Sequence, residues 1–159
     1  MPIARSIFFT FLLPGTVTVV IPYFIVSGGR IDHPESRALW GYLGWLPIGL
    51  GAGILFWCIW DFAVAGRGTL APIDPPKQLV VRGLYRYVRN PMYVGVVSIL
   101  LGESLFFGSL ALLGYAIAFF IFAHIFVVLY EEPALFRKFG ESYQAYRQRV
   151  HRWLPRNPT

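Results

Sequence analysis

Two short stretches of the chain carry polar side chains that could do chemistry, and each borders a long apolar segment. The first, residues 79–95, reads LVVRGLYRYVRNPMYVG. Its arginines are four and three residues apart, so they would share one face of a helix that ends before Pro91. We call residues 79–90 the collar. A cationic, aromatic collar can bind an anionic or amphipathic ligand at a membrane surface, or it can anchor a helix by snorkelling. Its arginines are Arg82, Arg86 and Arg89.

The second stretch is a pair of adjacent acidic residues, Glu131 and Glu132, at the end of a long apolar segment. Carboxylates are uncommon there because the position borders the low-dielectric membrane core. A salt bridge to Arg86 or Arg89 would explain them structurally. Alternatively, a ligand with both a cation and a carboxylate would be held between Glu and Arg. His124, two turns before Glu131 on the same helical face, is expected to be a hydrogen-bonded packing residue.

The composition is that of an integral membrane protein. Of 159 residues, 56% are hydrophobic and 14% are charged, which lies outside the range of globular domains. The formal net charge of +6 comes from basic residues that border apolar segments, so we expect anionic lipid headgroups, and not nucleic acid, as partners. Cys58 is the single cysteine, and no Cys/His cluster predicts a metal site.

Uncharged segments predict about four membrane spans. Residues 6–29 and 38–60 each exceed the ~20 residues that cross the hydrocarbon core, and internal prolines predict kinks in the first. In residues 90–130 the one ionised side chain expected is Glu103, and a turn at 106–109 would divide this segment into a tight hairpin of helices. Glu103 would reach water near the hairpin tip, or act as an intramembrane proton site. Small residues favour close helix packing at Gly49, Gly53, Gly95, Ser98 and Gly102.

The remaining segments are a loop and a tail. Residues 61–77 contain three prolines and no periodicity, which predicts either a plain surface loop or a lid. After the Glu pair, apolar residues recur at helical spacing and predict an amphipathic helix in the headgroup region, with Gly140 as its weak point. These apolar residues are Leu135, Phe139, Tyr143, Tyr146 and Val150.

The expected fold is an all-α integral membrane protein with about four transmembrane helices, the last two a tight hairpin, and a C-terminal amphipathic interfacial helix. Most lysines and arginines then lie on the side of the collar and tail, which the positive-inside rule assigns to the cytosol together with both termini. Such a multi-pass protein is typical of a bacterial or archaeal inner membrane. The single membrane domain would have four parts: two spans (1–61), the loop and collar (62–90), the hairpin (91–130), and the Glu pair with the tail (131–159).

GLYRYVRNPMYVG, followed by EEPALFRKFGESYQAYRQRV and a terminal RWLP, resembles the isoprenylcysteine carboxyl methyltransferase and phospholipid methyltransferase family. That family shows an Arg-His-Pro-x-Tyr-x-Gly motif, then a Glu-Glu pair ahead of Leu, Phe-Gly and two tyrosines. The resemblance covers the C-terminal half. It implies S-adenosylmethionine bound at the cytosolic ends of the last spans and a lipophilic substrate that arrives through the bilayer. It places at the cofactor Tyr85, Arg89, Asn90, Tyr93, Glu131 and Glu132, with Tyr146 on the covering tail.

The implied reaction is methyl transfer to a lipophilic carboxylate, amine or thiol, driven by positioning because the methyl sulfonium is already activated. The catalytic residues are not identified, and Arg89 and Glu131 are the best candidates. Either glutamate would hold the methionine ammonium, and Arg89 or a backbone N–H would hold its carboxylate. Asn90 stands where the family usually has histidine. An amide can hydrogen-bond but cannot take a proton near pH 7, so any proton removal by that histidine is lost here.

Two other classes of protein fit parts of the sequence. Membrane sterol reductases have a similar Arg-His-Pro-x-Tyr motif near a nicotinamide cofactor, but their chains have many more spans, and this chain lacks a glycine-rich dinucleotide fingerprint. A small four-helix transporter or assembly module would use Glu103 for coupling and the Gly49/Gly53 pair for dimer packing. That reading leaves the collar and the Glu pair with no role beyond anchoring.

Overall fold

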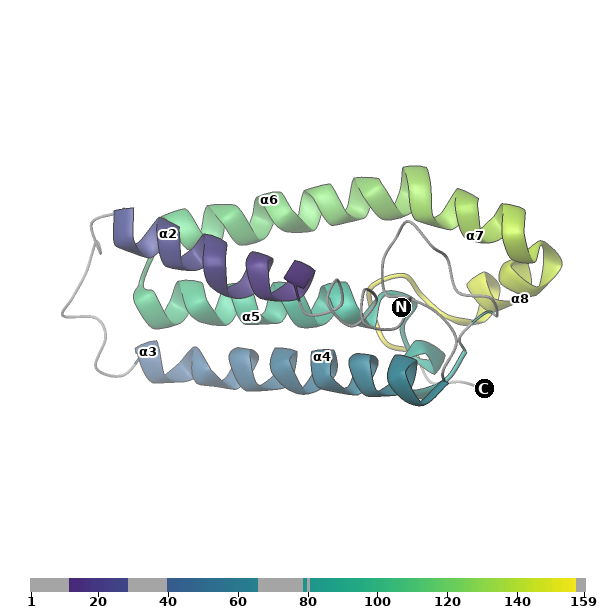
Figure 1. The fold of residues 1–159 in the computed structure, drawn as a ribbon, viewed down its shortest axis with the longest axis horizontal. Helices are drawn as coiled ribbons and strands as arrows, with labels where there is room; N and C mark the ends of the chain where they lie inside the picture. Colours follow the sequence, from purple (N-terminus) through teal and green to yellow (C-terminus); the bar gives the residue numbers. More distant parts are fainter. Residues whose placement is uncertain (1–11, 29–39, 66–78, 80, 157–159) are drawn as a thin grey trace, which may run out of the picture.

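The structure is a computed structural model that describes residues 12–28, 40–65, 79 and 81–156 (Figure 1). These residues are mostly helical and contain no β-strand, and an isolated parallel bridge joins Val88 to His151. The helical class predicted from the sequence is therefore confirmed.

The helices α4, α5 and α6 lie side by side with α5 between the other two, and α2 covers α5 and α6 (Figure 1). The run from α6 through α7 continues past the ends of α4 and α5, and α8 folds back from it. In chain order the elements are the π-helical turn η1 (Thr16–Val20), α2 (Ile21–Gly28), α3 (Trp40–Leu43), α4 (Trp45–Ala65), the 3₁₀ turn η3 (Gly83–Arg86), α5 (Pro91–Phe107), α6 (Leu110–Phe126), the π-helical turn η4 (Val127–Glu131), α7 (Glu132–Phe139) and α8 (Glu141–Arg149).

Two helices are long and apolar enough to cross a membrane, Gly41–Asp61 and Leu110–Phe139. Two further apolar helices, Leu12–Gly28 and Pro91–Phe107, are shorter. In the first of these, η1 comes directly before the segment that contains Pro22, which has no N–H to donate to the preceding turn. Two of the four predicted spans therefore have the length that a membrane span requires.

Glycines let α4 and α5 pack closely. A Cβ atom on Gly51 would collide with the carbonyl oxygen of Gly95, and one on Gly44 would lie 2.5 Å from that of Gly102. The two pairs are seven residues apart and run in opposite directions, so α4 and α5 are antiparallel. Gly95 and Gly102 thus belong to a close contact, as predicted. The other predicted pair, Gly49 and Gly53, is exposed, and among the described residues nothing lies within 4 Å of a Cβ added at either position.

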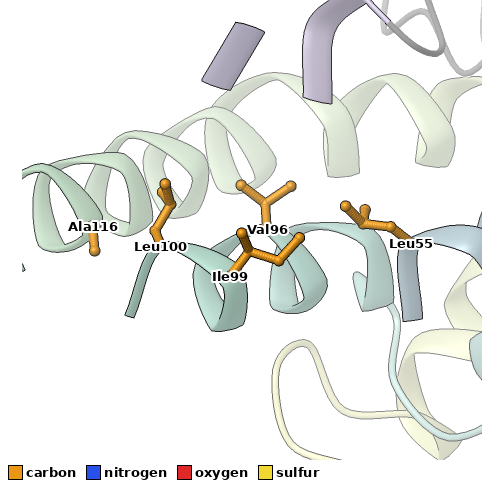
Figure 2. Close-up of a cluster of buried hydrophobic side chains, with 5 residues drawn as sticks. All are labelled: Leu55, Val96, Ile99, Leu100 and Ala116. Atoms are coloured by element: carbon orange, nitrogen blue, oxygen red, sulfur yellow. The ribbon is translucent and has the colours of Figure 1, made fainter. Parts of the chain in front are cut away.

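The apolar core lies between these helices. Figure 2 shows its buried side chains, which come mainly from α5, with one from α4 and one from α6. Partly buried residues, including Val17 from η1, pack around this cluster, so the N-terminal helix is joined to the same core. The buried cluster consists of Leu55, Val96, Ile99, Leu100 and Ala116.

The collar does not form a helix with three arginines on one face, which corrects the prediction. Gly83 has a φ of +54° and the backbone at Arg82 is extended, so only the short turn η3 precedes α5. A side chain at Gly83 would also collide with the Asp61 carboxylate. The arginines therefore have separate environments. Arg82 Nε lies 3.8 Å from Asp61 Oδ1, Arg86 is exposed, and Arg89 faces the start of α7.

The tail forms two helices and not the single amphipathic helix that was predicted. Gly140, with a φ of +52°, separates α7 from α8, so the predicted weak point is a break. The apolar face of the tail packs against itself and against the collar, and so it is not free to face lipid. Buried at this contact are Tyr143, Tyr146 and Val150, with Leu79, Leu135 and Phe139 packed around them.

Several predictions concern the segments between helices. The polar loop at 30–37 and most of the proline-rich segment, with the lid hypothesis, lie outside the described residues. Residues 61–65 complete α4 and are not loop, because DFAVA contains no glycine or proline that would end a helix. On α5, the side chain of Glu103 is half-buried, and its Oε2 atom is buried without a hydrogen-bond partner among the described residues, so its contact with water stays a prediction.

Candidate functional site

A cluster of charged side chains lies where α7 begins. Glu132 is only 7% exposed, and two arginines bind its carboxylate. Arg152 donates from Nε and Nη2 to Oε1 and Oε2 at 2.7 and 3.0 Å. Arg89 Nη1 lies 3.1 Å from Oε1. Two-point binding by a guanidinium is the strongest geometry for this pair of groups, so the charge of Glu132 is balanced within the protein.

Glu131 has a different environment, although it is the adjacent residue. Its Oε2 accepts a hydrogen bond of 3.4 Å from the Tyr93 hydroxyl, and the side chain is half-buried. Arg89 also keeps unused capacity, because its Nε is buried and has no hydrogen-bond partner in the part of the chain that the structure describes. A carboxylate with one long hydrogen bond and a guanidinium with a free N–H are thus present at the same end of the bundle.

Tyr85 connects the collar to α4 and to the tail. Its side chain is hydrogen-bonded to Cys58 on α4, and its carbonyl oxygen accepts a hydrogen bond of 2.6 Å from the Tyr146 hydroxyl. Burial, with Cys58, Glu131 and Tyr146 nearby, raises the pKa of Tyr85 well above its ordinary value. The Tyr85 hydroxyl therefore stays neutral further into the alkaline range than an exposed tyrosine does.

Residues 151–156, which we call the strap, cross the collar next to the charged cluster. The Arg89 N–H donates to the carbonyl oxygen of His151 at 2.9 Å, and the Arg156 N–H donates to that of Tyr87 at 3.0 Å. Within the strap, Trp153 Nε1 donates to His124 Nδ1 at 3.0 Å. The strap thus ties the collar to α6, and His124 is the hydrogen-bonded packing residue that was predicted.

Asn90 has a structural role that the sequence did not disclose. Its side chain is 8% exposed, and its Nδ2 atom donates to the carbonyl oxygen of Arg152 at 3.2 Å. The residue that departs from the family motif therefore holds the strap in place through an amide donor, which needs no proton transfer.

The predicted cofactor residues come together at one end of the bundle. Arg86, proposed as a partner of the Glu pair, is exposed, and Arg89 alone of these two takes that role.

The sequence prediction missed Arg152 and Trp153, for which the terminal RWLP was the available signal. Among the described residues, no group of three or more His, Cys, Asp or Glu side chains could hold a metal ion. The residues brought together are Tyr85, Arg89, Asn90, Tyr93, Glu131, Glu132 and Tyr146.

Comparison with known proteins agrees with the motifs. A family model described as phospholipid methyltransferase matches residues 39–142, which include the collar and the Glu pair. An uncharacterized protein of Haemophilus influenzae is 44% identical over 64 residues, which make up 40% of this chain and 100% of that protein. No solved structure matches the chain significantly. Because the family model covers more than half of the chain, and because the expected motifs lie together in the fold, the chain belongs to the phospholipid methyltransferase family.

Proposed function

We propose that the protein transfers the methyl group of S-adenosylmethionine to a lipophilic acceptor at the cytosolic face of a membrane. The observation that carries this proposal is the pair of groups with unused hydrogen-bonding capacity beside the collar. Glu131 offers a carboxylate, and Arg89 offers a buried Nε donor. The methionine part of the cofactor has an ammonium and a carboxylate on one carbon, so groups of opposite charge would bind both.

The two glutamates have different roles in this proposal. Glu132 is bound by Arg89 and Arg152, and loss of either partner would leave a buried charge unbalanced. It therefore orients Arg89 and does not bind the ligand. Glu131 is left to hold the ammonium, which narrows the sequence prediction that either glutamate could do so.

The protein's remaining task is to position the reactants and to exclude water. S-adenosylmethionine supplies a methyl group that is already activated, so no strong base is needed to start the transfer. Tyr93 and Trp153 contact each other edge to face beside Glu131, with ring centroids 6.4 Å apart. The strap and the buried tyrosines of the tail close the same end of the bundle. The acceptor is lipophilic, and a carboxylate, an amine and a thiol are each compatible with these residues.

The proposed membrane placement has four spans with both termini in the cytosol. Large apolar side chains are exposed along α4 and α6, which a membrane protein directs towards lipid and a soluble protein would bury. All described ion pairs lie at the end of the bundle that carries the collar and tail. Such an end belongs in the headgroup layer and the cytosol, where the positive-inside rule also places it.

Cofactor binding should depend on the Glu131 carboxylate. Calorimetric titration of the detergent-purified protein with S-adenosylmethionine and S-adenosylhomocysteine should show saturable binding. Glu131→Gln should weaken it by about 10- to 100-fold, because a hydrogen bond to a charged group contributes about 1.5–3 kcal/mol. Glu141→Gln is the matched control, since Glu141 is an exposed glutamate of the tail that makes no contact in the proposed site. Unchanged affinity in a folded Glu131→Gln protein would contradict the proposal.

A small proton-coupled transporter is the second candidate, and Glu103 is the observation that favours it. A buried carboxylate oxygen without a partner in the described structure is the kind of group that takes up and releases protons inside a membrane. A transporter would show pH-dependent flux in liposomes that Glu103→Gln abolishes, and it would not bind S-adenosylmethionine. Binding of NADPH in the same titration would instead indicate a membrane reductase.

A further inference from the structure

The exposed side of the tail contains a groove that the proposed methyl transfer does not use. The groove lies between α7 and α8, is open to the surroundings, and has a volume of about 340 Å³. One apolar side chain from α7 and three polar side chains from α8 line it. They are Phe136, Gln144, Arg147 and Gln148.

The location of the groove follows from the length of the helix that carries it. Leu110–Phe139 is one continuous helix of 30 residues, or about 45 Å at the rise of an α-helix. The hydrocarbon core is only about 30 Å thick, so the last third of this helix extends beyond it. The first ~20 residues of this helix cross the core and end at about Tyr130. Phe136 is six residues further, or about 9 Å along the helix axis, which places the groove at the outer edge of the lipid headgroup layer.

The groove also has the charge and donors that suit an anionic headgroup. Its Arg147 is exposed and makes no ion pair within 4 Å in the part of the chain that the structure describes, although it interacts electrostatically with Glu132 over a longer distance. The planar guanidinium binds two phosphate oxygens at once, and the two glutamine amides add N–H donors. Around the groove, the exposed charged residues of α7 and α8 are Arg137, Lys138, Arg147 and Arg149, with Glu141 as the acidic exception.

Phe136 adds the feature that favours a lipid over a free ion. Its side chain is 49% exposed at the wall of the groove, where a water-soluble phosphate would leave it in contact with water. A phospholipid would cover it with the CH₂ groups of its headgroup and glycerol backbone. We propose that this groove binds the headgroup of an anionic phospholipid from the cytosolic leaflet. The proposal rests on the membrane placement argued above but does not depend on methyl transfer.

Native mass spectrometry of the full chain in detergent can test this proposal. The protein would be titrated with phosphatidylglycerol and with phosphatidylcholine of the same acyl chains. We expect phosphatidylglycerol to be retained, and Arg147→Gln to weaken its retention by about tenfold through loss of a charge-assisted contact. Arg149→Gln is the matched control, because Arg149 is exposed on the same last turn of α8 but does not line the groove. It should change retention less than twofold.

Further variants and a soluble competitor distinguish a bound lipid from other occupants of the groove. Arg147→Lys keeps the charge but loses the planar fork, so it should fall between wild type and Arg147→Gln. Equal losses in the Arg147 and Arg149 variants would overturn the proposal, since they would indicate general surface charge. Equal retention of the two lipids would overturn it as well. Complete displacement of the lipid by millimolar glycerol phosphate would overturn the preference for a lipid, since it would show that a soluble phosphate competes for the groove without acyl chains. Circular dichroism of each variant checks that the total helix content is unchanged.

Discussion

Two neighbouring glutamates in this protein, Glu131 and Glu132, differ in the hydrogen bonds and ion contacts that their carboxylates receive. Successive residues of a helix point about 100° apart, so one side chain of an adjacent pair can face the core of a site while the other faces its edge. Glu132 receives three hydrogen bonds or ion contacts from Arg89 and Arg152, whereas Glu131 receives a single long one from Tyr93. The motif therefore combines a structural carboxylate with one that has capacity left for a ligand.

This difference predicts that Glu132 contributes more than Glu131 to the stability of the protein, whereas Glu131 contributes more to cofactor binding. Glu132→Gln should lower the free energy of unfolding by about 3 kcal/mol, because it leaves two partly buried guanidiniums without their counter-charge. Glu131→Gln should lower it much less, since only the hydrogen bond from Tyr93 is altered. Thermal unfolding in detergent measures both. If Glu131→Gln were the more destabilising change, the assignment of Glu132 as the structural member of the pair would be wrong.

At the scale of the elements, glycines set how closely helices approach, but their spacing alone does not identify the partner. Gly49 and Gly53 match the best-known packing motif and yet are exposed. Gly44 and Gly51, seven residues apart on another face of the same helical stretch, are the ones that meet α5. A sequence pattern defines a face of a helix, whereas the contact also depends on which neighbour lies opposite that face.

Alanine substitutions should show which of these two glycine faces is packed against another helix. Gly51→Ala places a methyl group against the carbonyl oxygen of Gly95, and such overpacking costs typically about 1–3 kcal/mol. Gly49→Ala meets open space and should be neutral or stabilising by up to about 1 kcal/mol, because alanine favours a helix over glycine. Unfolding in denaturant measures both variants. Equal destabilisation by the two would indicate that the exposed face also packs, for example against a second copy of the chain.

The elements that the sequence predicts well are those with local signals at their ends. Pro91 is the first residue of α5 and Gly108, with a φ of +59°, ends it, so both bounds follow from nearby residue types. The strap carries no such signal, and the collar carries only Gly83, whose φ is +54°. Their conformation depends on contacts between residues far apart in the chain, such as Asn90 with Arg152 and Tyr85 with Tyr146. Spacing within one segment cannot report those contacts, which is why the collar was predicted as a helix.

At the scale of the whole molecule, the polar contacts are concentrated at one end. The described ion pairs, the strap and the buried tyrosines of the tail all lie where the collar meets α4, α7 and α8. The other end of the helical bundle has the short turn between α5 and α6, at Gly108 and Ser109. The rest of the bundle is joined mainly by apolar side chains and glycine contacts, and its polar groups are few, among them Glu103 and the Tyr115 hydroxyl, which donates to the carbonyl oxygen of Val17. The two ends should therefore respond differently to pH.

Alkaline pH should release the tail before it affects the bundle. Burial raises the pKa of Tyr143 and Tyr146 above the value of about 10 of an unfolded tyrosine. Above pH 10 the released tail can lose protons that the docked tail retains, so docking is fully stable below that pH and weakens as pH rises beyond it. Ionisation of Tyr146 also removes the donor of its bond to the Tyr85 carbonyl oxygen. Tyrosinate absorbance should thus show a late step, while circular dichroism shows that α4, α5 and α6 persist.

Tyr146→Phe provides the control for this titration. It removes one ionisable group and one hydrogen bond, so docking should be weaker at neutral pH but should depend less on pH above 10. Tyr42, an exposed tyrosine distant from the tail along the chain, offers a comparison in the variant Tyr42→Phe, which should leave the late step unchanged. A late step of the same size in Tyr146→Phe would mean that other tyrosines produce it. The tail would then not be the part of the molecule that responds first to alkali.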